Sequence, residues 1–346
     1  MRQGPLGTVL VLTTVAVVTG SPSVVGALRT AATGAPATQC SEVEVPVSVP
    51  GGSGPIAGTL CQPPGATTVQ LLVHGYTYGR YYWAMPQLTE TYSYALRANL
   101  AGYATLAIDR IGIGASWHPP SPLITYDSNV SAVHQVVQAL RGGTLRMAYR
   151  KVVLAGHSYG ALTALLEAGT YHDVDALIID GGGHRYNPVN IGLLIETNMI
   201  PATSDPKFAN SGYDPGYETT RSGTRSVFYN EPDADPAVIA LDEQLKQTGT
   251  RLEGFTGALY PLRTADRGLA IPSFTVNGDK DPFFCDHAED CSSSDALAAF
   301  ERPFYAPGAV VRARVFPGAG HDINLERVAP QVFASILAFV DRYVGH

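Results

Sequence analysis

One serine of the chain stands between two glycines, where an apolar run meets a helix-like segment. In VVLAGHSYGALTALL, Gly156, Ser158 and Gly160 form the pattern G-x-S-x-G. A serine on a very sharp strand-to-helix turn adopts strained backbone angles and leaves no room for side chains two positions before and after it. Such a turn sets the hydroxyl at a helix N-terminus, where developing negative charge is stabilised. Ser158 is therefore a candidate nucleophile, and the alternative is a buried serine in an ordinary β-to-α turn.

A second stretch that could carry chemistry is TVNGDKDPFFCDHAEDC, residues 275–291. Its acidic residues are Asp279, Asp281, Asp286, Glu289 and Asp290. They could bind a metal ion, form a solvated acidic turn or include one catalytic carboxylate. Calcium favours clustered carboxylates, but the spacing lacks the alternation and the central glycine of a calcium loop. We therefore expect no metal here, and we expect Asp286, Glu289 and Asp290 to form a solvated acidic turn between two cysteines.

These candidate residues must be positioned by regular elements, and the chain repeats a strand-helix pattern. Near-continuous apolar runs, which suit strands buried on both faces of a parallel sheet, occupy residues 69–75, 103–110, 151–158, 175–182, 272–279 and 309–318. Helix-length segments such as YGALTALLEAG lie between them and end at glycine. Two earlier runs, EVEVPVSV and IAGTLCQP, predict an antiparallel hairpin at a sheet edge. The pattern predicts an α/β fold, with a mostly parallel central sheet flanked by helices.

The strand-helix rhythm stops between residues 184 and 269. This interval shows no comparable strand pattern and is rich in Tyr, Pro, Asp and Gly, as in SGYDPGYETTRSG. So long an insertion in a compact domain is most often a lid or cap over a site. We expect a helical lid inserted in a catalytic domain that spans residues 40–346.

Four motifs stand at the ends of predicted strands. They are LLVHGYTYG after the third strand, DRIGIGAS after the fourth, GHSYG after the fifth and GAGHDINLE after the last. In this order they resemble the α/β-hydrolase fold family, and the resemblance extends from about residue 41 to the end of the chain. It implies that Ser158 is the nucleophile and that His321 is its general base. It also implies an oxyanion hole formed by the backbone N–H groups of Tyr76 and Tyr159.

The resemblance also implies where the third member of a catalytic triad stands. In the family, the strand before the acid commonly ends in a glycine, two variable residues and then the acid. GDKDP fits with Asp281, three residues after Gly278, and leaves Asp279 on the turn as the alternative. The acid must hold the tautomer of His321 and stabilise the imidazolium. We expect His74, in the HG pair, to be a structural brace.

The stretch GYTYGRYYW, which follows the HG pair, is crowded with aromatic side chains. It contains Tyr76, Tyr78, Tyr81, Tyr82 and Trp83. So many rings over a nucleophile predict the wall of a pocket for an apolar or aromatic substrate. We expect Tyr78, Tyr82 and Trp83 to bind substrate, and the alternative is that half of the aromatic residues pack under the lid.

The first 39 residues predict a cleaved export signal followed by a flexible stretch. Arg2 precedes an apolar run from about Leu6 to Val18, and small residues follow. The run is shorter than the ~20 apolar residues of a membrane-spanning helix, so we expect no stable membrane anchor. The sequence therefore predicts a secreted, extracellular protein.

The four cysteines agree with export. An even number of cysteines behind an export signal predicts two disulfides in an oxidising compartment. Three pairings are possible, and proximity along the chain favours Cys40 with Cys61 and Cys285 with Cys291. The alternative is four free, buried thiols.

Composition narrows the class of function. The 346 residues are 45% hydrophobic and 15% charged, as in a globular protein, and a net charge of -7 without lysine or arginine runs argues against a nucleic-acid partner. We therefore expect a secreted serine hydrolase that cleaves a carboxylic ester of an apolar or aromatic small molecule, without metal or organic cofactor. In the family the same triad also serves lactones, thioesters, amides and carbon–carbon bonds, and the scaffold could instead be a non-catalytic binding protein.

Overall fold

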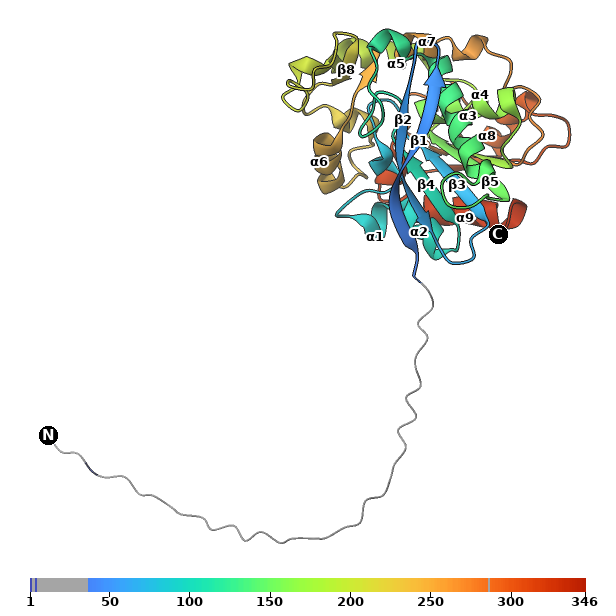
Figure 1. Cartoon of the computed structure of the whole chain (residues 1–346), viewed down its shortest axis with the longest axis horizontal. Helices are drawn as coiled ribbons and strands as arrows, with labels where there is room; N and C mark the ends of the chain where they lie inside the picture. The colour runs from blue at the N-terminus through green and yellow to red at the C-terminus, as the bar shows by residue number, and fades with distance from the viewer. Residues whose placement is uncertain (2–3, 5–36, 286) are drawn as a thin grey trace, which may run out of the picture. The chain divides into compact units, whose positions relative to one another are not determined.

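The main strands assemble into an eight-stranded sheet with the order β1-β2-β4-β3-β5-β6-β10-β11 (Figure 1). The computed structural model describes residues 1, 4, 37–285 and 287–346, and Ala37–His346 form one unit. The expected export signal therefore lies almost wholly outside the described residues. The strands of the sheet are β1 (Gln39–Val49), β2 (Gly52–Gln62), β3 (Thr68–Val73), β4 (Ala104–Ile108), β5 (Lys151–His157), β6 (Ala176–Asp180), β10 (Ser273–Gly278) and β11 (Val311–Phe316).

The centre of the sheet is parallel, as the apolar runs predict. β3 pairs in parallel with β4 and β5, β6 with β5 and β10, and β10 with β11. Every residue of β3, β4, β6 and β10 is buried, because these strands are covered on both faces. Their near-continuous apolar sequences follow from this burial.

An antiparallel hairpin forms one edge of the sheet. β1 pairs with β2, and β2 pairs antiparallel with β4. The register places Cys40 opposite Cys61, and a disulfide joins them. The predicted edge hairpin and the predicted pairing of these two cysteines are both present.

Helices cover the sheet in two groups. α3 packs against α4, which contacts β5 and β6, whereas α1 and α2 contact α9. The helices outside the insertion are α1 (Thr89–Tyr92), α2 (Tyr94–Leu100), α3 (Tyr126–Gly142), α4 (Tyr159–Tyr171), α8 (Ser294–Glu301) and α9 (Ala329–Tyr343). Local sequence sets the ends of α3, since Thr125 and Ser128 form a capping box at its start and Gly143, with φ of 74°, ends it.

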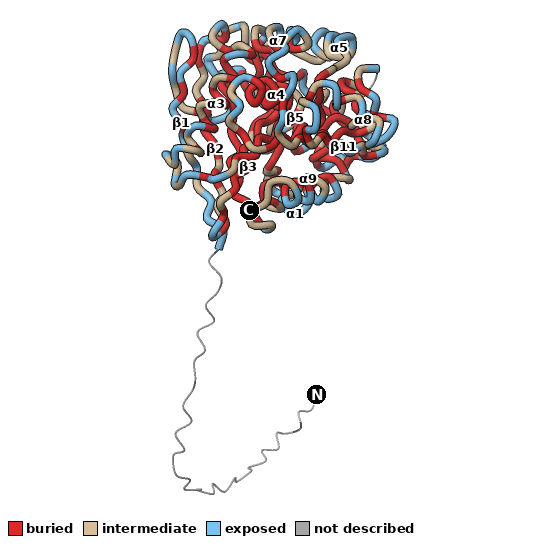
Figure 2. The backbone as a smooth tube through the Cα atoms, turned by 90° about the vertical axis from the view of Figure 1, so that its right-hand side faces the viewer, coloured by how far each residue is buried: buried red, intermediate tan, exposed pale blue. Residues whose placement is uncertain are grey.

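The segment 184–269, which we call the insertion, departs from the all-helical expectation. It contains α5 (Pro188–Asn198), α6 (Pro236–Leu245) and α7 (Arg251–Gly257), and also an antiparallel sheet of β7 (Met199–Pro201), β8 (Tyr217–Thr220) and β9 (Gly249–Thr250). Strands of two to four residues are too short to show an alternating pattern, so the sequence did not reveal them. α5 and α7 lie together at one end of the described unit in both views (Figures 1 and 2).

Burial follows the layers. The central strands β3, β4, β6 and β10 and the α4 residues 159–169 are buried, while the edge strands β1 and β11 carry exposed residues and α5 has no buried residue (Figure 2). No helix formed by the described residues is long and apolar enough to cross a lipid bilayer.

Candidate active site

Ser158 occupies the sharp turn between β5 and α4. Its backbone angles, φ 54° and ψ -119°, are unusual for a residue with a side chain. The flanking glycines are sterically required: a Cβ on Gly156 would lie 2.2 Å from the carbonyl oxygen of Gly160, and one on Gly160 would lie 2.4 Å from that of Val73. The G-x-S-x-G pattern therefore marks a strained turn that presents the serine at the start of α4.

A continuous hydrogen-bonded chain runs from Ser158 through His321 to Asp281. His321 Nε2 lies 2.8 Å from Ser158 Oγ, and His321 Nδ1 lies 2.8 Å from Asp281 Oδ2. The other carboxylate oxygen of Asp281 accepts the backbone N–H groups of Phe283 and Phe284, at 2.7 and 3.2 Å. These bonds fix the carboxylate plane, and the carboxylate in turn orients the imidazole toward the serine.

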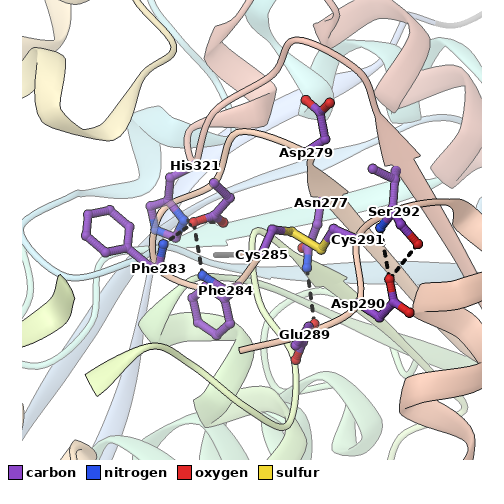
Figure 3. The surroundings of a disulfide bond; sticks show 12 residues. Asn277, Asp279, Phe283, Phe284, Cys285, Glu289, Asp290, Cys291, Ser292 and His321 are labelled. Carbon is purple, nitrogen blue, oxygen red and sulfur yellow. Dashed lines mark hydrogen bonds and ion pairs between the residues drawn. A yellow bond between two sulfur atoms is a disulfide. The ribbon is translucent and has the colours of Figure 1, made fainter. Parts of the chain in front are cut away.

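Asp279, the alternative acid, faces another direction. Its Oδ1 accepts the backbone N–H of Gly318 at 2.7 Å, and its Oδ2 lies 3.4 Å from Lys280 Nζ. Figure 3 shows its carboxylate pointing away from His321. Of the two aspartates, the structure brings only Asp281 to the histidine.

The acidic loop that follows is divided between interior and solvent. Cys285 and Cys291 form a disulfide across it (Figure 3), and Asp286 lies outside the described residues. Asp290 is solvent-exposed, and its hydrogen bonds with the side chain and backbone N–H of Ser292 lower the pKa of its carboxyl group.

Glu289 contradicts the expectation of a wholly solvated turn. It is 5% exposed, and its Oε1 accepts the backbone N–H of Arg185 at 3.2 Å. Burial raises the pKa of this carboxyl group well above its usual range, and the neighbouring Glu301 raises it further. Packing against the start of the insertion, which a sequence does not reveal, explains the difference.

The expected oxyanion donors lie on either side of the serine. Tyr159 follows Ser158 at the first position of α4, and a Cβ on Gly75 would lie 3.1 Å from Ser158 Cβ, which places the Gly75–Tyr76 peptide beside it. Among the residues that the structure describes, no acceptor takes the backbone N–H of Tyr76 or Tyr159. Both groups are free to bind an oxygen atom.

An apolar pocket of about 780 Å³, its open mouth included, leads to Ser158 and His321. Both the main domain and the insertion supply apolar residues to its walls. The main domain contributes Tyr78, Leu162, Phe283 and Phe284, and the insertion contributes Ile191, Leu194, Met199 and Phe228. None of the described residues that line it is acidic, and only His321 among them can carry a positive charge.

Of the three aromatic residues expected to bind substrate, the structure places only Tyr78 in the pocket wall. Tyr82 lies beneath the site, where its ring stacks on His157 with centroids 3.8 Å apart and its hydroxyl donates to Asp180 at 3.0 Å. Trp83 is buried between the rings of Tyr82 and Tyr94. Tyr82 ends the short helical turn Arg80–Tyr82 and Trp83 follows it, and both side chains are directed into the core.

Sequence reasoning missed the contribution of the insertion. Phe228 lines the pocket, and its carbonyl oxygen accepts the backbone N–H groups of His321 and Asp322, at 2.9 and 3.0 Å. Arg225, one helical turn earlier, is buried and bonded to both carboxylate oxygens of Asp242, at 2.9 and 3.0 Å. Nothing in the sequence distinguishes Arg225 from the other arginines of the insertion, such as Arg221 and Arg251, so this contact could not be predicted.

Buried titratable groups lie around the Arg225–Asp242 ion pair. Tyr78 donates its hydroxyl to Asp322, and burial raises the pKa of both groups well above their usual values. Burial likewise lowers the pKa of His157, and the adjacent His321 lowers it further. His157 is therefore neutral at physiological pH.

Two groups of described residues have ligand atoms close enough to share a metal ion. One is His157, His321 and Asp322; the other is His134, Glu167 and Asp173. The first group includes His321, which is hydrogen-bonded to Ser158. The second combines His134 on α3 and Glu167 on α4 with Asp173, which follows α4. The described acidic residues of the 279–291 loop form no such group.

Comparisons with known proteins agree with this geometry. The model of the alpha/beta hydrolase family matches residues 70–336. The sequence matches none of the curated proteins with which it was compared.

Solved structures with similar folds include an esterase and a lipase. An esterase of Thermogutta terrifontis with bound malate has 18% identity and a TM-score of 0.56, over 88% of this chain and 99% of the esterase. A lipase in an open form has 17% identity and a TM-score of 0.59, over 88% and 100% of the two chains. Est1E of Butyrivibrio proteoclasticus with bound ferulic acid has 17% identity and a TM-score of 0.51, over 87% and 100%.

Proposed function

Because the chain belongs to the alpha/beta hydrolase family, we propose that it is a serine hydrolase that cleaves carboxylic esters of apolar or aromatic small molecules. The observation that carries the proposal is the hydrogen-bonded chain of Ser158, His321 and Asp281 at the base of an apolar pocket. The esterase and lipase neighbours share the fold, which agrees with this activity.

Acylation begins at the Ser158 hydroxyl. As Oγ forms a bond to the ester carbonyl carbon, its proton passes to His321 Nε2, 2.8 Å away, and the carbonyl π electrons move to oxygen. Asp281 stabilises the imidazolium through Nδ1–H. The tetrahedral intermediate then collapses, the C–O bond to the alcohol breaks, and the alcohol leaves with the proton from His321.

Deacylation repeats these steps with water. His321 takes a proton from water as the hydroxide forms a bond to the acyl carbon, and Ser158 Oγ recovers the proton as the carboxylic acid leaves. In both acylation and deacylation, the backbone N–H groups of Tyr76 and Tyr159 donate hydrogen bonds to the oxyanion of the tetrahedral intermediate. Such donors typically contribute about 10²- to 10³-fold each to the rate.

The pocket supports an uncharged, apolar substrate. Apart from His321, its described lining residues carry no full charge, so an ionic group would be desolvated there without a partner. Exposed apolar side chains also surround the pocket elements: Val189, Leu193 and Ile195 on α5, and Phe255, Leu259 and Leu262 on and after α7. In Est1E a solved structure holds ferulic acid, an aromatic acid, which agrees with an aromatic acyl group as one option.

Two disulfides support an oxidising, extracellular location. Both pairs, Cys40 with Cys61 and Cys285 with Cys291, are bonded, and the described residues contain no free cysteine. Reducing compartments rarely preserve such bonds, so we infer that the protein is secreted.

Hydrolysis of p-nitrophenyl butyrate by the full chain and by Ser158→Ala tests the proposal. The wild-type protein should hydrolyse the ester and react covalently with a fluorophosphonate at Ser158, and the variant should do neither while keeping its melting temperature. A wild-type protein that resists the fluorophosphonate would instead indicate a binding protein. Full activity in Ser158→Ala would exclude the mechanism.

A further inference from the structure

Arg110, two residues after the end of β4, is a buried cation beside both expected oxyanion donors. It is 1% exposed, and its Nη2 donates to the carbonyl oxygen of Gly75 at 3.3 Å. Its guanidinium carbon lies 4.6 Å from the ring centroid of Tyr159. A buried arginine is costly to maintain, so its contacts indicate what it does.

The bond to Gly75 acts on the oxyanion site because a peptide group is a single unit. The carbonyl of Gly75 and the N–H of Tyr76 belong to the same planar amide. A donor on the oxygen fixes the plane of that amide, and chains of hydrogen bonds polarise one another, so the N–H at the other end becomes a stronger donor. The positive charge of Arg110 adds to this effect in a site of low dielectric constant.

His74 makes a second bond to the same oxygen. The backbone N–H of Arg110 donates to His74 Nε2 at 3.1 Å, so this nitrogen carries no proton, and Nδ1–H is left to donate to Gly75 O at 2.9 Å. Burial and the charge of Arg110 lower the pKa of His74 well below its usual value, which keeps this tautomer neutral. The Gly75–Tyr76 peptide is thus held from the carbonyl side by two donors.

The insertion holds the guanidinium from the other side. Arg110 Nη1 donates to Glu253 Oε2 and to Asn129 Oδ1, both at 2.9 Å. Glu253 lies on α7 and is completely buried, and its Oε1 accepts the backbone N–H of Thr250 in a capping box. Helix α7 therefore carries the counter-ion that fixes Arg110 over the peptide.

We propose that Arg110 is a positioning residue of the oxyanion hole, which orients and polarises the Gly75–Tyr76 peptide, and that Glu253 couples the insertion to this hole by holding Arg110 in place. The inference rests on the proposed ester hydrolysis through Ser158. It assigns a function to the arginine of the DRIGIGAS motif, whose glycines and serine shape only the turn.

A transition-state analogue separates this role from plain structural support. An alkyl trifluoromethyl ketone adds to Ser158 Oγ, and the resulting hemiketal oxygen occupies the oxyanion position. For Arg110→Gln we expect the inhibition constant of the ketone to rise by about tenfold or more, while KM for p-nitrophenyl butyrate changes by less than about threefold. Glu253→Gln keeps the cation on Gly75 O and leaves a neutral acceptor for Nη1, so the hold on Arg110 weakens and the inhibition constant should rise, but by no more than about threefold.

Two further variants separate a specific effect on the oxyanion hole from a general loss of stability. Arg110→Gln/Glu253→Gln removes both charges together, avoids an unpaired buried charge, and should reproduce the loss of ketone affinity. Asp205→Asn breaks another buried ion pair of the insertion, to Lys246 at 2.8 Å, and should lower the melting temperature without affecting the ketone.

The proposal is overturned if Arg110→Gln and Glu253→Gln weaken the ketone equally, because both would then act only through the broken ion pair. It is also overturned if Asp205→Asn weakens the ketone as much as Arg110→Gln does. A wild-type protein that binds no ketone and hydrolyses no ester contradicts the proposed function itself, and this inference with it. Normal wild-type hydrolysis with unchanged ketone affinity in Arg110→Gln contradicts the inference alone.

Discussion

The backbone N–H of Arg185 donates a 3.2 Å hydrogen bond to Glu289, which ties the disulfide-closed acidic loop to the first residues of the insertion. Arg185 stands one residue after His184, whose imidazole Nδ1 lies 2.5 Å from Glu301. Glu289 and Glu301 thus meet in the interior where the loop, the insertion and α8 join, and burial keeps the pKa of Glu289 raised.

This raised pKa predicts a pH-dependent stability. Above the usual glutamate pKa, about 4.3, the unfolded chain ionises Glu289 while the folded protein retains the proton, so stability falls as pH rises toward the folded pKa. Glu289→Gln should therefore raise the melting temperature relative to the wild type, and by more at pH 8 than at pH 5. Asp290→Asn is the control: its pKa is lowered, so it should show no such gain. Equal effects of Glu289→Gln at both pH values would contradict this assignment.

The assignment of the triad acid predicts unequal effects of two aspartates. Asp281→Asn should lower kcat by about 10³- to 10⁴-fold, because the amide no longer holds the reactive tautomer of His321. Asp279→Asn, which alters only the bond to Gly318, should leave kcat nearly unchanged. Steady-state kinetics on p-nitrophenyl butyrate measures both. The opposite order would transfer the role to Asp279.

The two disulfides should differ in their effect on catalysis. Loop-closure entropy suggests losses of about 2 kcal/mol for Cys285→Ala/Cys291→Ala and about 3 kcal/mol for Cys40→Ala/Cys61→Ala, from separations of 6 and 21 residues. Only the first pair closes the loop next to Asp281, so only its removal should lower kcat. Equal kcat values for the two double variants, at a temperature where both are folded, would show that the position of Asp281 does not depend on the Cys285–Cys291 disulfide.

The apolar wall predicts a dependence on acyl chain length. Leu194→Ser removes part of the pocket wall that α5 supplies and should lower kcat/KM for p-nitrophenyl hexanoate by about tenfold, in line with 1 to 2 kcal/mol of lost burial. The acetate, which reaches less far, should be affected little. Leu100→Ser is the matched control, since Leu100 is an exposed leucine outside the pocket. Identical losses for acetate and hexanoate would place the acyl chain elsewhere.

Local rules made much of the fold predictable. Strands buried on both faces leave continuous apolar runs, and the G-x-S-x-G spacing of Ser158 follows from a sharp turn in which Gly156 lies against Gly160 and Gly160 lies against the neighbouring strand at Val73. The burial of Glu289 could not be predicted from local sequence, because it depends on contacts with Arg185, which is distant along the chain. Tyr82 shows the same for orientation, since a single helical turn decides whether its ring enters the pocket or the core.

The carbonyl of Phe228, which accepts the N–H groups of both His321 and Asp322, means that the insertion is not an independent module. Exchanging it as one block for the corresponding segment of another hydrolase would also remove the hydrogen bonds that hold the His321 loop. Variation of substrate range in this protein is therefore better confined to α5, which lines the pocket but has no buried residue. In any such exchange, residues 225–230 would have to be kept together with the loop that carries His321.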